Sequence, residues 1–200
     1  MAKKDLSGRE IWQDYSGFNA KEAEDNFFKV FSMHFQGTNF CVEPKPKEMK
    51  KIYVDFKSDP QTIEEIYNPN FEIKTHGISP DYCIRNIKTK KNLYVEVKRQ
   101  DGWVEGKERS AGRGNAHERS CKFFTPGLQK VLYKYSNINP PELPFWVVFI
   151  GDITRDPCRV REISLWYSGV EKNMFFWRDQ NKKDPLIQHF ELHLKHLLLN

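Results

Sequence analysis

The feature that most constrains the fold is a strictly alternating segment at 93–99, which reads Leu-Tyr-Val-Glu-Val-Lys-Arg. Successive side chains of a β-strand point to opposite faces, so the three apolar residues of this segment lie on one side. Glu96 and Lys98 then lie together on the other side, which we expect to be the polar face of a half-buried sheet. The segment predicts a strand that carries a carboxylate and an ammonium side by side.

A hairpin is expected to end at this strand. Ser-Pro-Asp-Tyr at 79–82 precedes it, and the polar run 86–91 is interpreted as the hairpin connection. A connection centred between residues 88 and 89 pairs position 81 with position 96. Asp81 is therefore expected beside Glu96 across one antiparallel ladder.

Two carboxylates and a lysine on one face suit metal-assisted phosphate chemistry. Carboxylate oxygens bind Mg²⁺, which keeps positions for water and phosphate oxygens. A metal held by Asp81 and Glu96 can polarise a phosphoryl oxygen and lower the pKa of a bound water. Lys98 can orient the water or stabilise the negative charge of the transition state. The structural alternative is that Asp81 is a turn residue and that Glu96 and Lys98 are solvated strand positions.

The Pro-Asp…Glu-X-Lys pattern resembles the signature of the PD-(D/E)XK nucleases. A second, independent motif follows in the expected order, because Gly-Arg-Gly-Asn-Ala-His-Glu-Arg-Ser-Cys-Lys at 112–122 resembles the Gly-Asn-Ala-X-Glu-Arg-Ser-X-Lys segment of EcoRI-type restriction endonucleases. Segments 98–107 and 143–149 resemble the members of that family that cut CAATTG. The resemblance covers most of the chain from Ser79 to Tyr167.

The resemblance implies an α/β fold, a mixed central sheet of about five strands with helices on both faces. It implies one endonuclease domain over 1–200, with a catalytic hairpin at 79–99, at one end of the sheet. A Gly-rich DNA-recognition arm and helix start would follow at 100–122. The implied activity is that of a type II site-specific deoxyribonuclease with Mg²⁺, or Mn²⁺ in its place. A homodimer would cut double-stranded DNA at C/AATTG and leave 5′-phosphate AATT overhangs.

The Gly-rich arm (100–122) can be interpreted as a mobile surface loop or as an extended arm that lies close to DNA. Asn pairs with adenine, Arg pairs with guanine, and Ala contacts the thymine methyl group. By resemblance, Asn115, Ala116 and Arg119 would read the inner A·T pairs, and Glu118 would brace Arg119. Our hypothesis for Arg113, which departs from the EcoRI pattern, is that it reads the outer C·G pair. The predicted DNA-contacting set is Arg113, Gly114, Asn115, Ala116, Glu118 and Arg119.

The composition is that of a globular chain, with 30% charged and 38% hydrophobic residues among 200. No apolar run approaches the roughly 20 residues needed to span a bilayer, and the start has no signal-peptide core, so we expect a cytoplasmic protein. The resemblance implies that it belongs to a bacterial-type restriction system. The four cysteines are widely spaced and indicate neither a zinc site nor disulfides. The net charge of +5 is compatible with an anionic partner without proving one.

Other segments predict the elements around the hairpin. Glu24 is interpreted as a surface residue, although a helix glutamate of this kind could lie near the catalytic carboxylates. His117 is interpreted as a packing or DNA-proximal residue. The remaining expectations are a helix at 19–36 with a buried Phe stripe, a Pro/Lys loop at 43–51, helices at 60–67, 125–135 and 186–199, a central strand at 145–150, a strand edge at 166–167 and a short strand at 175–177.

Two other function classes remain open. A structure-selective repair or recombination nuclease would share the metal site without base readout, and it would not cut at one sequence only. A non-catalytic DNA-binding protein would use the carboxylates only to tune affinity, and it would show no Mg²⁺-dependent strand scission.

Overall fold

A five-stranded mixed sheet forms the centre of the computed structural model, which describes residues 24–54, 74–108 and 117–199. The strand order is β1-β2-β3-β4-β5. The pairs β1–β2 and β2–β3 are antiparallel, and β3–β4 and β4–β5 are parallel. The predicted fold class is therefore confirmed. The strands are β1 (Phe40–Pro44), β2 (Tyr82–Asn86), β3 (Asn92–Arg99), β4 (Phe145–Ile150) and β5 (Met174–Trp177).

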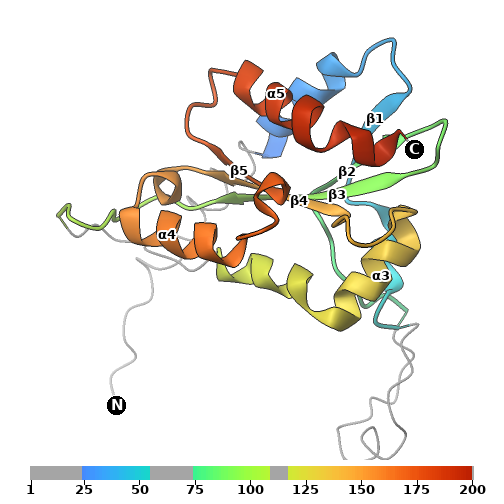
Figure 1. Ribbon diagram of the computed structural model, residues 1–200, viewed down its shortest axis with the longest axis horizontal. Helices are drawn as coiled ribbons and strands as arrows, with labels where there is room; N and C mark the ends of the chain where they lie inside the picture. The colour runs from blue at the N-terminus through green and yellow to red at the C-terminus, as the bar shows by residue number, and fades with distance from the viewer. Residues whose placement is uncertain (1–23, 55–73, 109–116, 200) are drawn as a thin grey trace, which may run out of the picture.

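Helices cover both faces of this sheet (Figure 1). Residues 24–34 are helical and lie with α5 on one face, whereas α3 and α4 lie on the other. The bounds are α3 (Pro126–Ser136), α4 (Pro157–Trp166) and α5 (Asp184–His193), with 3₁₀ turns η1 (Lys47–Lys51), η2 (Glu118–Phe124), η3 (Asp152–Thr154), η4 (Glu171–Asn173) and η5 (Lys195–Leu198).

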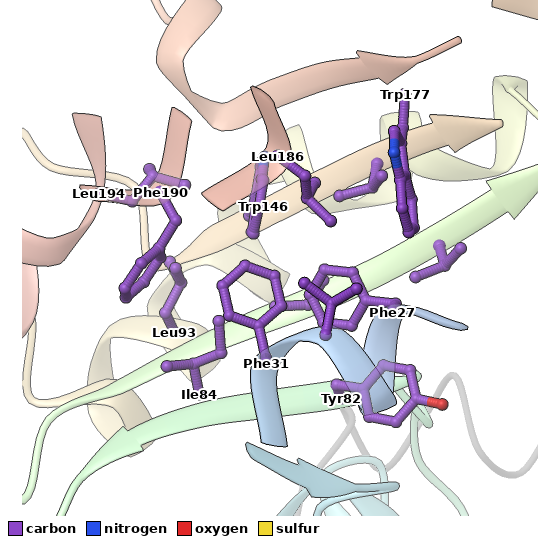
Figure 2. Close-up of a cluster of buried hydrophobic side chains, with 14 of the residues drawn as sticks. Phe27, Phe31, Tyr82, Ile84, Leu93, Trp146, Trp177, Leu186, Phe190 and Leu194 are labelled. Carbon is purple, nitrogen blue, oxygen red and sulfur yellow. The ribbon is translucent and has the colours of Figure 1, made fainter. Parts of the chain in front are cut away.

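The first half of the core lies between the sheet, the helical residues 24–34 and α5, as Figure 2 shows. Phe27 stacks on Tyr82 at 5.3 Å between ring centroids, and Phe31 packs edge-on against Trp146 at 5.8 Å. Phe190 of α5 contacts Phe31 from the other side. The Phe stripe predicted for the first helix is thus core, because its rings fill the space above β2 and β4.

The second half of the core lies on the opposite face, beneath η2, α3 and α4. Phe123 of η2 stacks on Phe145 of β4 at 5.1 Å between ring centroids. Phe124 meets Tyr167 edge-on, which joins η2 to the end of α4. All six residues of β4 are buried, as expected of a parallel strand covered on both faces.

Three expectations from the sequence are wrong. The sheet is not half-buried at the hairpin, because both faces of β3 are covered as far as Val97. The hairpin strands are second and third in the sheet rather than at its end, because β1 pairs outside them. Trp166 ends α4 and Tyr167 caps it, so they form no strand edge; Asp156 accepts hydrogen bonds from the N–H groups of Cys158 and Arg159 and thereby starts a helix there.

Smaller differences concern the loop at 43–51 and the last helix. The first two residues of that loop belong to β1, and its last five form η1. The predicted helix at 186–199 is divided into α5 and η5, with Leu194 between them. The helix expected at 60–67 and the first residues of the helix expected at 19–36 lie outside the described residues. No helix in the described part of the chain has the length and apolar character of a membrane span.

Candidate active site

The β2–β3 hairpin places Asp81 opposite Glu96. The register pairs Tyr82 with Val95, so the residue before β2 faces position 96, as the sequence predicts. The N–H of Val97 donates to Asp81 Oδ2 over 2.8 Å and fixes the carboxylate against β3. Alternation then sets Asp81 on the same face as Glu96 and Lys98. The hairpin alone brings the three predicted catalytic side chains together.

The Glu96 carboxylate is nearly enclosed, and its two oxygens differ in their surroundings. Its side chain is 5% exposed, and Oε1 forms an ion pair with Lys98 Nζ at 2.6 Å. Oε2 is buried and has no hydrogen-bond partner among the described residues. A buried carboxylate oxygen without a partner is costly, so this atom is suited to receive a cation or a donor that arrives with a ligand.

The pKa of Asp81 reflects the same enclosure. Burial first, and then the negative charge of Glu96, raise it to about 7, while Lys98 and the Val97 N–H oppose the rise. Two carboxylates that face each other repel, and a bound cation would remove this repulsion. A cation bound between the two carboxylates would therefore favour the ionised form of Asp81.

Glu24 lies closer to this site than the sequence interpretation favoured. Burial raises its pKa, and its charge interacts with those of Lys98, Glu96 and Asp81. Glu24 is partly buried at the start of the helical residues 24–34, and its charge interacts with those of both carboxylates, which favours the alternative placement near the pair over that of a plain surface residue. The sequence held one signal for this placement, a glutamate three residues before the buried Phe27.

Lys122 is the residue that sequence reasoning missed. Its Nζ lies 3.5 Å from Glu96 Oε1, the oxygen that Lys98 also contacts. The signal was available, because Lys122 is the last residue of the Gly-Asn-Ala-X-Glu-Arg-Ser-X-Lys segment. Nothing in the spacing from Glu96 indicated the contact, which depends on how η2 lies against β4.

The structure describes two of the six predicted DNA-contacting residues. Arg113, Gly114, Asn115 and Ala116 lie outside the described residues. Glu118 and Arg119 are exposed at the start of η2, where they are open to a ligand in solution. The helix start expected near Ala116 is the 3₁₀ turn η2 rather than a regular α-helix.

His117 directly precedes η2 and packs against α4, away from the carboxylate site. It is fully buried and stacks on Trp166 at 5.4 Å with ring planes 6° apart. Its Nε2 lies 3.3 Å from Glu162, which also pairs with Arg159. Burial, and then Arg159, lower the pKa of His117. The packing interpretation is confirmed, and His117 fastens the end of the Gly-rich arm to α4.

The donor set fits a hard divalent cation. Within residues 24–54, 74–108 and 117–199, no group of three or more His, Cys, Asp and Glu side chains is arranged as a complete metal cage. Asp81 and Glu96 instead offer two carboxylates, one with a buried oxygen that lacks a partner. Mg²⁺ is typically bound by one or two carboxylates together with water and phosphate oxygens. The four free cysteines and the histidines of α5 add no further ligand.

Comparison with known proteins identifies the family. The family model described as type II restriction enzyme MunI matches residues 1–199. The chain belongs to the MunI family of type II restriction enzymes. It is 51% identical to the type II restriction enzyme MunI of Mycoplasma sp. over 201 residues, which cover 99% of this chain and 100% of that protein.

A solved structure agrees with this membership. The chain is similar to the crystal structure of MunI restriction endonuclease in complex with cognate DNA, with a TM-score of 0.80 and 50% sequence identity. The match covers 94% of this chain and 96% of that chain. Membership in the family makes the protein a restriction endonuclease, and it agrees with the resemblance seen in the two sequence motifs.

Proposed function

We propose that the chain is a Mg²⁺-dependent endonuclease that cuts double-stranded DNA at C/AATTG, with Mn²⁺ able to replace Mg²⁺. The observation that carries this proposal is the juxtaposition of Asp81, Glu96 and Lys98 on one face of the β2–β3 hairpin. The family supplies the reaction class, and the buried Glu96 Oε2 supplies the place for a cation.

Each of the three residues has a distinct role in this proposal. Asp81 and Glu96 hold the metal, which when bound supplies Lewis-acid polarisation of the phosphate and a lower pKa for water. Lys98 directs its ammonium into the same site, where it orients the attacking water and offsets the charge on the phosphate oxygens. In-line attack displaces the 3′ oxygen, so the ends carry 5′-phosphate and 3′-hydroxyl groups.

Sequence readout belongs to the end of the Gly-rich arm. Asn115, Ala116 and Arg119 read the inner A·T pairs, with Glu118 bracing Arg119, and Arg113 reads the outer C·G pair. The exposure of Arg119 at the start of η2 supports this assignment. Gly114 allows the backbone to come close to the DNA.

The solved relative is a MunI–DNA complex, which supports duplex DNA as the partner here. A palindromic target suits an isologous homodimer with one active site for each strand. The proposal treats 1–200 as one endonuclease domain that acts in the cytoplasm without an organic cofactor.

The test is a digest of long DNA of known sequence with Mg²⁺, followed by sequencing of the ends. Uniform AATT overhangs preceded by C on each strand are expected. Scattered ends, or cuts confined to junctions, would replace the readout proposal with a structure-selective nuclease. A protein that binds DNA but never cuts it with Mg²⁺ or Mn²⁺ would contradict the proposed reaction.

A further inference from the structure

Glu96 Oε1 is held by two ammonium groups that come from different parts of the fold. Lys98 Nζ lies at 2.6 Å and belongs to the same strand as Glu96, two residues further on. Lys122 Nζ lies at 3.5 Å and belongs to η2, which follows the Gly-rich arm. The position of Lys98 is set by β3 itself, whereas the position of Lys122 depends on where η2 lies relative to the sheet.

Lys122 is next in sequence to Phe123, a buried residue that packs η2 against the sheet. The neighbouring Phe123 is 1% exposed and stacks on Phe145 of β4. Lys122 Nζ lies 5.1 Å from the centre of the Phe123 ring. The carbonyl of Lys122 accepts hydrogen bonds from both the N–H and the hydroxyl of Thr125, at 3.1 and 2.8 Å. The stacking of Phe123 on Phe145 holds this part of η2 on the sheet, and the Thr125 hydrogen bonds fix the end of the turn.

The chain between Lys122 and the exposed Arg119 is short and stiff. Ser120 is buried, and its hydroxyl donates to the carbonyl of His117 over 2.7 Å. His117 is itself clamped on Trp166. η2 therefore holds Arg119 and Lys122 in a fixed relation to each other and to Glu96.

We propose that Lys122 is a positioning residue that couples η2, which carries the exposed Arg119, to the carboxylate Glu96. In the free protein its ammonium partly neutralises Glu96 and weakens the hold of the site on a divalent cation. When Arg119 engages the DNA, Lys122 on the same turn keeps Glu96 in the orientation that the metal needs. This inference rests on the proposed function, since it assigns Glu96 to the metal site.

The first measurement needs no DNA. Binding of Mn²⁺ to the free protein is followed by calorimetry for the wild type, K122Q and K122R. K122Q should bind Mn²⁺ about fivefold more tightly, because one positive charge close to the carboxylates is gone. K122R should behave like the wild type. The control is K130Q, which removes a charge from an exposed position on α3 and should leave Mn²⁺ affinity unchanged.

The second measurement is discrimination between DNA sites. For K122Q the ratio of cleavage rates at CAATTG and at a site with one changed base should fall at least about tenfold, mainly through the rate at CAATTG. K122R should restore part of the ratio. Unchanged Mn²⁺ affinity together with an unchanged ratio in K122Q would overturn the coupling role.

Folding of the variant separates a positioning role from a structural one. Lys122 is 39% exposed at its side chain, so K122Q should melt within about 2 °C of the wild type. A much larger loss of thermal stability would make Lys122 a structural residue and overturn the proposal. A wild type that never cleaves DNA would overturn the proposed function, whereas the Mn²⁺ comparison would still report on the Lys122–Glu96 contact.

Discussion

The N–H of Val97 donates to the carboxylate of Asp81 across 2.8 Å, so a hydrogen bond from backbone to side chain ties Asp81 to β3 beside Glu96. The same bond stabilises the ionised form of Asp81, yet burial and Glu96 outweigh it. The free protein therefore holds a carboxylate whose pKa is raised by the fold, which makes its stability sensitive to pH.

Asp81→Asn should change how the stability of the metal-free protein depends on pH. The folded pKa of Asp81 is about 7 and its ordinary value is 3.8, so the folded state keeps this proton more firmly. Its stabilising contribution is complete below about pH 4 and is lost as the pH rises to 7. At pH 8 the variant should be more stable than the wild type, by about 1–3 kcal/mol.

Thermal melts of both proteins between pH 5 and pH 8 without metal would check this. The two curves should converge toward pH 5. Mg²⁺ should stabilise the wild type more than the variant, because only the wild type offers both carboxylates. Parallel curves over the whole pH range would show that Asp81 is not enclosed as described.

Glu96→Ala should abolish cleavage while DNA binding without metal persists or tightens. The carboxylate is lost from the metal site, and its repulsion of the phosphates is lost with it. The rate should fall by on the order of a thousandfold, equivalent to about 4 kcal/mol of transition-state stabilisation. Single-turnover cleavage and fluorescence anisotropy measure the two effects. Near-normal turnover would remove Glu96 from the metal site.

Glu96→Gln provides a second comparison, because it keeps the size of the enclosed side chain. It should also lose cleavage, although it still accepts a hydrogen bond from Lys98. Cleavage retained by the Gln variant and lost in the Ala variant would assign Glu96 a packing role.

Arg113→Ala should weaken discrimination at the outer base pair of the target. Loss of a bidentate contact to guanine costs about 1–3 kcal/mol of discrimination. The measurement is the ratio of cleavage rates at CAATTG and GAATTC. Arg119→Ala is the matched comparison, since it should instead affect the inner A·T pairs. If Arg113→Ala leaves the preference between the two sites intact, the outer pair is read elsewhere.

Gly151→Ala should disturb the point where the Gly-rich arm leaves the sheet. Gly151 has a φ of +87°, and an added Cβ would lie 2.3 Å from Asp101 Oδ1 and 2.9 Å from the Gln100 carbonyl oxygen. The positive-φ backbone, which alanine rarely adopts, and the clash together should cost about 2–4 kcal/mol of stability. Denaturant melts give this value, and the displaced arm should also slow cleavage.

Gly127→Ala is the control for that substitution. Gly127 lies in the first turn of α3, where an added Cβ meets no atom within 4 Å. Alanine should stabilise the helix by about 0.5–1 kcal/mol and leave cleavage unchanged. Equal losses of stability in the two variants would show that the close approach at Gly151 is not what matters there.

The juxtaposition of Asp81 and Glu96 could be predicted from the sequence because it is local. Asp81 and Glu96 lie in one hairpin, and the centre of its polar connection is sufficient to set the register. The buried strand 145–150 was predictable for a similar reason, since a short continuous apolar run is typical of a strand covered on both faces. Both expectations rest on periodicity within a short stretch.

The contact of Lys122 with Glu96 could not be predicted in this way. It depends on Phe123 stacking on β4, a pairing between segments that no local pattern relates. Trp166 and Tyr167 were misread because aromatic pairs are common in strands, while the capping signal of Asp156 before Pro157 was overlooked. The position of Glu24 relative to the carboxylates depends on how its helix packs on the sheet, and its spacing from Phe27 alone does not give that packing.

The Gly-rich arm lies within the long connection from β3 to β4, whereas the two carboxylates lie on the β2–β3 hairpin itself, Asp81 directly before β2 and Glu96 within β3. The free-energy cost of closing a loop rises only slowly with its length, so a long connection tolerates insertions and substitutions. The part of the chain that chooses the DNA site can therefore diverge while the part that cuts stays the same. In evolutionary terms, a changed recognition segment must still place Lys122 beside Glu96 if the proposed coupling is to be kept.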